Sequence, residues 1–173
     1  MKFSLHKSLE ILENTPAVIS ALLNNLTDEW TTTNEEDNTW NPMEVVAHLI
    51  VCEKTDWLPR VKIILSHLED KTFVSINMTA HFDIAKSNSM KDLIKEFKQL
   101  RESGIKEIKA FNLQEADLRK IAIHPTLGEV NLQHLFATWV VHDLTHIAQI
   151  SRVIAKQNKE NVGAFAPFLN ILK

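Results

Sequence analysis

The segment 132–153 has the clearest periodicity in the chain, because selected residues recur at alternating intervals of three and four. This spacing places them along one side of an α-helix, like the seam that a bundle helix turns toward its neighbours. Only three glycines and five prolines occur in 173 residues, so few positions interrupt helices. The sequence therefore predicts an all-α protein with a single domain over residues 1–173. The seam consists of Leu132, Leu135, Trp139, His142, His146, Gln149 and Val153.

The first helix is expected to begin near Ser4 or Ser8 and to end at about Asn25, because apolar residues recur between them at helical spacing. Pro16 is a point at which this helix could bend. Residues 31–39 are polar and show no apolar periodicity, so they are predicted to form a connecting loop.

The second helix has the best-defined start. Asn41 can accept backbone N–H groups, a proline follows it, and Glu44 can complete a capping box. The helix should continue toward Leu68, with a kink near Trp57 because Pro59 removes one backbone donor.

Two further helices follow the same reasoning, over residues 89–110 and from residue 131 to about 156. Residues 71–88 are apolar but irregular, which predicts an ordered loop that packs on the protein. Residues 112–130 indicate a loop or a short irregular hairpin. The tail 165–172 has enough apolar residues for one short docking turn.

Charge and hydropathy exclude several classes of partner. The formal net charge is −3 and the basic residues are dispersed, so nucleic acid is an unfavourable partner. No segment has the apolar length of a membrane span, and the first residues lack the apolar core of a signal peptide. Cys52 is the single cysteine, which fits a reducing compartment. We therefore expect a cytoplasmic protein with no membrane partner.

Three histidines form the candidate site. His142 and His146 lie one helical turn apart on the seam, so their rings can share one metal ion at bonds of ~2.0–2.1 Å. His48 lies in an apolar stretch of the second helix and is the best candidate for a third ligand. Three neutral histidines leave coordination positions open, and on zinc the pKa of a bound water can fall to ~7. This pattern favours a catalytic metal.

A simpler interpretation of the histidines stays open, namely that they pack in the core without any metal. The pair also resembles the metalloprotease pattern His-Glu-x-x-His, but Asp143 stands where the general base Glu is required. A peptidase is therefore disfavoured. No catalytic residue and no cofactor-binding residue can be assigned from the sequence.

The remaining polar candidates have weaker signals. His6, His67 and His81 are expected at the solvated surface. Cys52 could be a soft fourth ligand, but a buried thiol that packs as a small hydrophobe fits better. His134 is expected in the core or at the surface, and His124 is expected to make a loop contact or to line a pocket. Glu53 and Asp56 are expected to face solvent or to surround the ligands.

The segments 40–49 and 135–150 resemble the two signature helices of the DinB superfamily. The resemblance covers most of the chain, including His124-Pro125 and Gly128 before the last helix, and it is strongest around His142 and His146. It implies an up-down-down-up four-helix bundle, with His48, His142 and His146 as ligands of nickel, zinc or a similar divalent ion.

Relatives in this superfamily are often homodimers, so the resemblance also implies a homodimer. The superfamily includes bacillithiol transferases and mycothiol-dependent maleylpyruvate isomerase. A metal-dependent hydrolase or low-molecular-weight-thiol transferase that acts on a small molecule is thus the first hypothesis. A non-catalytic metal-binding domain, stress-associated or structural, is the alternative. Residues 71–88 match no pattern that identifies a thiol or a substrate.

Overall fold

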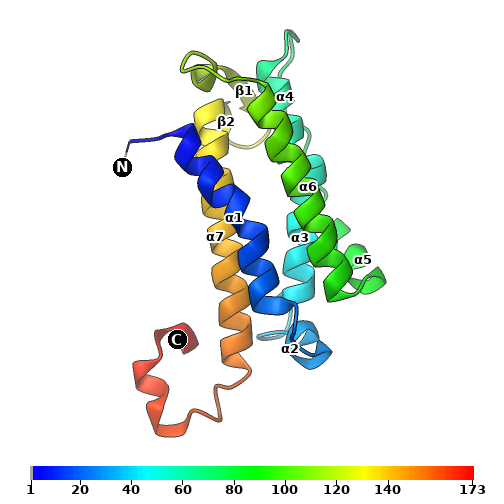
Figure 1. Cartoon of the computed structure of the whole chain (residues 1–173), viewed down its shortest axis with the longest axis vertical. Helices are drawn as coiled ribbons and strands as arrows, with labels where there is room; N and C mark the ends of the chain where they lie inside the picture. The colour runs from blue at the N-terminus through cyan, green and yellow to red at the C-terminus, as the bar shows by residue number, and fades with distance from the viewer. Residues whose placement is uncertain (1) are drawn as a thin grey trace.

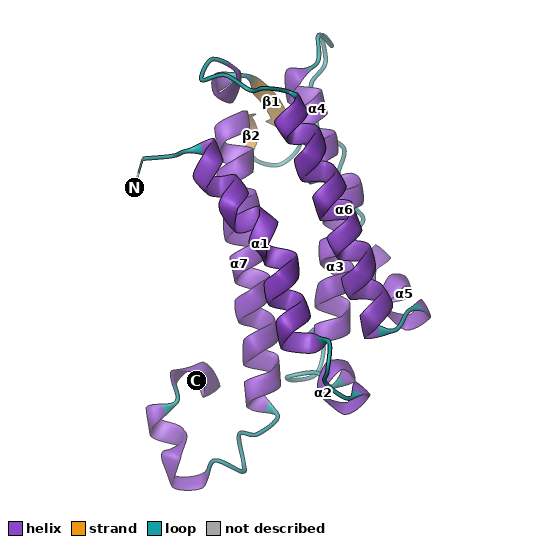
Figure 2. Cartoon of the chain, viewed as in Figure 1, coloured by secondary structure: helices purple, strands orange, loops and turns teal. Residues whose placement is uncertain are grey.

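Four long helices dominate the computed structural model, which describes residues 2–173 (Figures 1 and 2). In Figure 1, α1 and α7 run in one direction, and α3 and α6 run in the opposite direction. Both α1 and α3 contact α6, and both also contact α7. The predicted all-α bundle with up-down-down-up topology is thus confirmed. The four helices are α1 (Leu5–Leu23), α3 (Pro42–Thr55), α6 (Met90–Ala110) and α7 (Leu132–Lys156).

Short elements connect the long helices and cover the two ends of the bundle (Figure 2). They are α2 (Asp28–Thr32), α4 (Trp57–Leu65), α5 (Ala80–Ser87), η1 (Asp117–Arg119), β1 (Ile121–His124), β2 (Gly128–Asn131), η2 (Gly163–Phe168) and η3 (Asn170–Leu172). β1 and β2 form an antiparallel hairpin, which is one of the two alternatives expected for residues 112–130. Over residues 2–173, helices of sufficient length are too polar to cross a membrane.

The helix starts agree with the predicted capping residues. Ser4 caps α1, and Asn41 forms a complete capping box with Glu44, in which both N–H···O distances are 3.0 Å. The expected kink of the second helix is a break at Asp56, which separates α3 from α4 and lies close to Pro59. The helical path ends at Leu65, three residues before the predicted end.

The prediction for residues 71–88 is half right. Phe73 is buried, and its N–H donates to Ile123 O at 2.9 Å, so the first part is an ordered loop that packs. The second part is the helix α5, not a loop. Its buried residues are His81 and Ala85, with Ile84 packed against the core, and a helix of eight residues is too short to reveal a helical period in the sequence.

The other two connections also differ in part from expectation. The loop predicted for residues 31–39 begins with the last residues of α2. In the tail, only Leu172 is buried, whereas Phe165 and Phe168 are 72% and 83% exposed. The final turn of the tail, η3, packs against α7.

A polar layer divides the core into two apolar clusters. Trp139 and Phe136 belong to one cluster, and Phe97 and Ile150 belong to the other. Arg101 lies between these residues along the helices and is fully buried, with its guanidinium about 5 Å from the rings of both Phe97 and Trp139.

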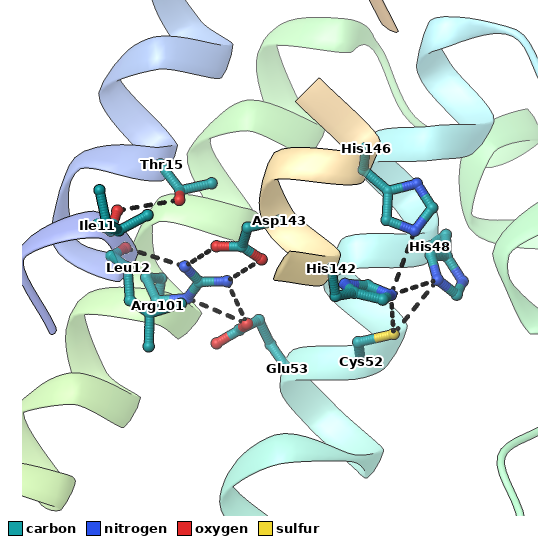
Figure 3. Close-up of polar contacts among 10 residues, drawn as sticks. All are labelled: Ile11, Leu12, Thr15, His48, Cys52, Glu53, Arg101, His142, Asp143 and His146. Atoms are coloured by element: carbon teal, nitrogen blue, oxygen red, sulfur yellow. Dashed lines mark hydrogen bonds and ion pairs between the residues drawn. The ribbon is translucent and has the colours of Figure 1, made fainter. Parts of the chain in front are cut away.

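Arg101 links all four long helices (Figure 3). From α6 it donates to Leu12 O on α1 at 2.9 Å, to Glu53 on α3 at 2.8 and 3.1 Å, and to Asp143 on α7 at 2.6 and 3.1 Å. Glu53 is therefore buried in the core, where its charge is paired. The interpretation that placed Glu53 at the solvent is wrong.

Replacement of Arg101 by Met should lower the free energy of unfolding by about 3–5 kcal/mol, because two carboxylates would stay buried without their cation. Urea unfolding followed by circular dichroism measures this change. Lys98→Met is the matched control on the same helix, since the exposed Lys98 forms only a loose ion pair with Glu102 at 3.7 Å. Equal stability of the two variants would contradict the structural role of Arg101.

Candidate metal centre

The structure brings His48, His142 and His146 together between α3 and α7 (Figure 3). His142 Nε2 lies 3.1 Å from His48 Nε2 and 3.2 Å from His146 Nε2. One ligand atom from each of the three residues lies within 4.8 Å of those from the other two. The three predicted residues thus form one cluster.

The two separations of 3.1 and 3.2 Å fit nitrogens that share one cation. Two nitrogens at ~2.0–2.1 Å from one ion, at angles between 90° and tetrahedral, are about 2.9–3.4 Å apart. Hydrogen bonds alone satisfy the cluster poorly, because a proton on His142 Nε2 can be donated to only one of its two nitrogen neighbours. A cation at the common point would accept all three lone pairs.

Neighbouring side chains fix how the rings point. His146 Nδ1 lies 2.8 Å from Gln149 Oε1, and donation of its proton there leaves Nε2 with a free lone pair. Trp57 packs edge-on against His142 with ring centroids 5.0 Å apart, and Trp40 stacks beside His146 at 6.2 Å. The ligand atoms are therefore oriented by both a hydrogen bond and aromatic packing.

Burial keeps the three histidines neutral. Burial, together with the charges of the neighbouring histidines, lowers the pKa of His48 to about 4 and that of His142 to about 3. The pKa of His146 is also lowered, again chiefly by burial. Neutral imidazole is the form that binds metal ions, so the cluster is ready to bind one near neutral pH.

Cys52 lies beside the cluster but outside the group of three. Its Sγ is 3.5 Å from His48 Nε2 and 4.0 Å from His142 Nε2. Burial raises the pKa of this thiol well above its usual range. The neutral, packed thiol is the interpretation that the surroundings of Cys52 favour.

A cavity of about 490 Å³ adjoins the histidines. Most of its wall is apolar and comes from α4, the loop before α5, the hairpin and α7. The three histidines, Asp56, Arg60 and His124 are the polar groups most relevant to its chemistry. Its apolar residues include Trp40, Trp57, Phe73, Ile76, Met78, Leu127, Val130 and Leu135. The cavity has the size of a small-molecule site.

The other histidines and Asp56 lie partly where the sequence predicts and partly elsewhere. His124 lines the cavity, as one of its two interpretations had it, and His134 is exposed at the cavity edge. The surface prediction for His81 is wrong, because it is 1% exposed and packs on Trp40 with ring centroids 4.2 Å apart. Asp56 is buried in the cavity wall, so its solvent interpretation is wrong.

Sequence reasoning did not identify Arg60 as part of the site. A signal existed, because His48, Cys52, Asp56 and Arg60 follow one another at intervals of four. This spacing places residues on one side of a continuous helix, and the interval continues across the break at Asp56.

The family comparison agrees with this fold and this cluster. Residues 11–150 match the family model of the DinB superfamily, and the chain belongs to this superfamily. The resemblance that the two signature segments indicated is therefore confirmed. No curated protein sequence matches the chain significantly.

Two solved structures share the architecture. One is that of YfiT from Bacillus subtilis, described as a probable metal-dependent hydrolase with an unusual four-helix bundle topology; it is 18% identical, with a TM-score of 0.72 over 94% of this chain and 91% of YfiT. The other is TT2238, described as a four-helix bundle protein; it is 17% identical, with a TM-score of 0.56 over 86% of this chain and 98% of TT2238. At these identities the likeness shows a common fold.

The lowered pKa values predict how the chelator-treated protein responds to acid. Between about pH 6.5 and pH 4, His48 and His142 stay neutral in the folded chain but become protonated in the unfolded chain. The unfolded state then binds more protons, so the free energy of unfolding should fall as the pH is lowered through this window. Urea titrations at a series of pH values measure it.

His142→Gln should flatten this pH dependence, because one of the responsible groups is removed. His6→Gln is the control, since the side chain of His6 is 84% exposed. A His142→Gln variant with the same pH dependence as the parent chain would contradict the assignment.

Proposed function

We propose that this protein is a metal-dependent hydrolase of small molecules, in which His48, His142 and His146 hold one divalent ion, zinc or nickel. The observation that carries the proposal is the meeting of three ring nitrogens, 3.1 and 3.2 Å apart along the cluster, at the wall of a cavity. The description of YfiT as a probable metal-dependent hydrolase supports the same reaction class.

The donor set suits a reactive centre. Three nitrogen ligands leave positions for exchangeable groups, whereas structural zinc sites are closed by four protein ligands. A divalent ion held there supplies Lewis acidity, which polarises a bound substrate or lowers the pKa of a bound water. The wall of the cavity is mostly apolar, and Gln149 keeps the His146 ring in the tautomer that presents Nε2 to the ion.

The second candidate reaction is the transfer of a low-molecular-weight thiol to a small molecule. The same ion would lower the pKa of a thiol from solution, and the cavity would hold the electrophile. Cys52 is not the thiol of this proposal, because its own burial favours the protonated form. Turnover that depends on an added thiol would distinguish transfer from hydrolysis.

Elemental analysis tests the metal directly. The purified protein should contain about one divalent ion per chain, and His142→Ala should lose it, because two histidines bind such an ion weakly. His67→Ala is the control on a histidine outside the cluster. Equal metal content in the parent chain and in His142→Ala would contradict the ligand assignment.

Activity then separates an enzyme from a non-catalytic metal-binding domain. The metal-loaded protein is screened against a panel of esters, amides and thiol acceptors, with and without added thiol. Metal-dependent turnover supports the proposal. A large fall of the melting temperature on chelation, together with no turnover in the panel, would instead favour a structural role for the ion.

We also propose that two copies associate through the outer face of α7. From residue 132 to residue 151 this helix has one charged side chain, Asp143, and that side chain is buried. Val141 and Leu144 are 62% and 48% exposed on the face that remains. A solvent-facing helix normally carries charges there, so an uncharged face suits contact with an equally uncharged face. A second copy offers such a face by symmetry.

Leu144→Glu should convert a dimer into a monomer, because two carboxylates would be brought into the apolar contact. Size-exclusion chromatography with light scattering measures the mass. Gln99→Glu adds the same charge at an exposed position of α6 and should leave the mass unchanged. A monomeric parent chain, or a dimer that survives Leu144→Glu, would contradict this surface.

A further inference from the structure

The cavity beside the histidines contains a second polar feature, the ion pair of Arg60 and Asp56. Arg60 Nε lies 2.5 Å from Asp56 Oδ1, and the two side chains are only 11% and 6% exposed. Both residues line the same cavity as His48, His142 and His146. A buried cation in a mostly apolar wall is costly unless its donors are used.

The ion pair does not satisfy all the hydrogen-bonding groups of its two side chains. Arg60 Nε and Asp56 Oδ1 are both buried, and neither makes a well-aligned hydrogen bond within residues 2–173. Within residues 2–173, Asp56 is the only charged partner of Arg60. Burial raises the pKa of Asp56 to about 6 in spite of the cation beside it. The guanidinium of Arg60 therefore has fewer charged and hydrogen-bonding partners than that of Arg101.

Two neighbours define how Arg60 meets the cavity. Its Cζ lies 4.9 Å from the centre of the Phe73 ring, and this ring supports the planar group on one face. His124 shares the wall, and its pKa is lowered by burial and by the charge of Arg60. Arg60 is the one arginine or lysine among the residues that line the cavity.

We propose that Arg60 binds the carboxylate of a small, otherwise apolar substrate whose remaining part reaches the histidine cluster. A planar guanidinium matches a planar carboxylate through two parallel hydrogen bonds. Because Asp56 already lies beside Arg60, a monocarboxylate, which brings a single negative charge, fits better than a phosphate ester of higher charge. The apolar wall would contact the hydrocarbon part of the substrate. This proposal deepens the proposed function and rests on it for the reacting end of the substrate.

Binding of phenylacetate and phenylacetamide tests the proposal without any turnover. The two probes have nearly the same shape and differ in charge. By calorimetry, phenylacetate should bind at least about tenfold more tightly than phenylacetamide, because only the acid forms charge-assisted hydrogen bonds with Arg60. Arg60→Gln should abolish this preference, whereas Lys62→Gln, at an exposed cation on the same helix, should keep it.

A second variant guards against misfolding, because Arg60→Gln leaves Asp56 buried without its partner. The double variant Asp56→Asn with Arg60→Gln removes both charges and should also bind the two probes equally. Circular dichroism confirms that each variant is folded. Equal binding of the probes by the parent chain, a preference that survives in the folded variants, or no binding of phenylacetate would each overturn the proposal.

The same titrations on His142→Ala separate this proposal from the proposed function. A preference for the acid that persists without the metal ligand shows that Arg60, and not an ion, recognises the carboxylate. Loss of the preference in His142→Ala alone would assign the carboxylate to the metal and overturn the role of Arg60. Metal content and turnover, measured separately, decide the proposed function.

Discussion

The buried guanidinium of Arg101 is the interaction on which the arrangement of the helices depends. A fully buried cation must use its donors, and Arg101 does so toward one backbone oxygen and two carboxylates on three other helices. Each hydrogen bond has its own direction, so the helices can neither slide nor rotate without breaking one. Apolar packing alone tolerates such shifts more readily, because it has no direction.

This constraint also fixes the histidines. Glu53 is five residues after His48 on α3, and Asp143 is adjacent to His142 on α7. When Arg101 holds these carboxylates on one side of the two helices, the histidines are presented on the other side, where the cavity lies (Figure 3). The cluster is thus placed by rigid elements that a buried network orients, which is what a site with precise ligand geometry requires.

The sequence predicted the features that depend on local signals or on a regular period. The capping box at Asn41, the break near Pro59, the turn residues of the hairpin and the seam of α7 belong to this kind. The seam placed His142 and His146 on one side of α7, close to His48. Sequence reasoning missed features that depend on distant partners. The sequence leaves Glu53 between the solvent and the surroundings of the ligands, because its counter-charge, Arg101, lies 48 positions later. Buried His81 lies on a helix of eight residues, which is too short to show a clear period.

The division between bundle and cavity wall explains why fold and specificity can vary separately. Arg101 and the histidines lie on the long helices, which this chain shares with structures only 17% and 18% identical to it. Phe73 and His124 come instead from a loop and a hairpin, joined to each other by the N–H of Phe73 and the carbonyl of Ile123. Connecting segments tolerate substitution better than a packed bundle does. A change in this wall can therefore alter which molecule reaches the histidines while the network that positions them stays intact.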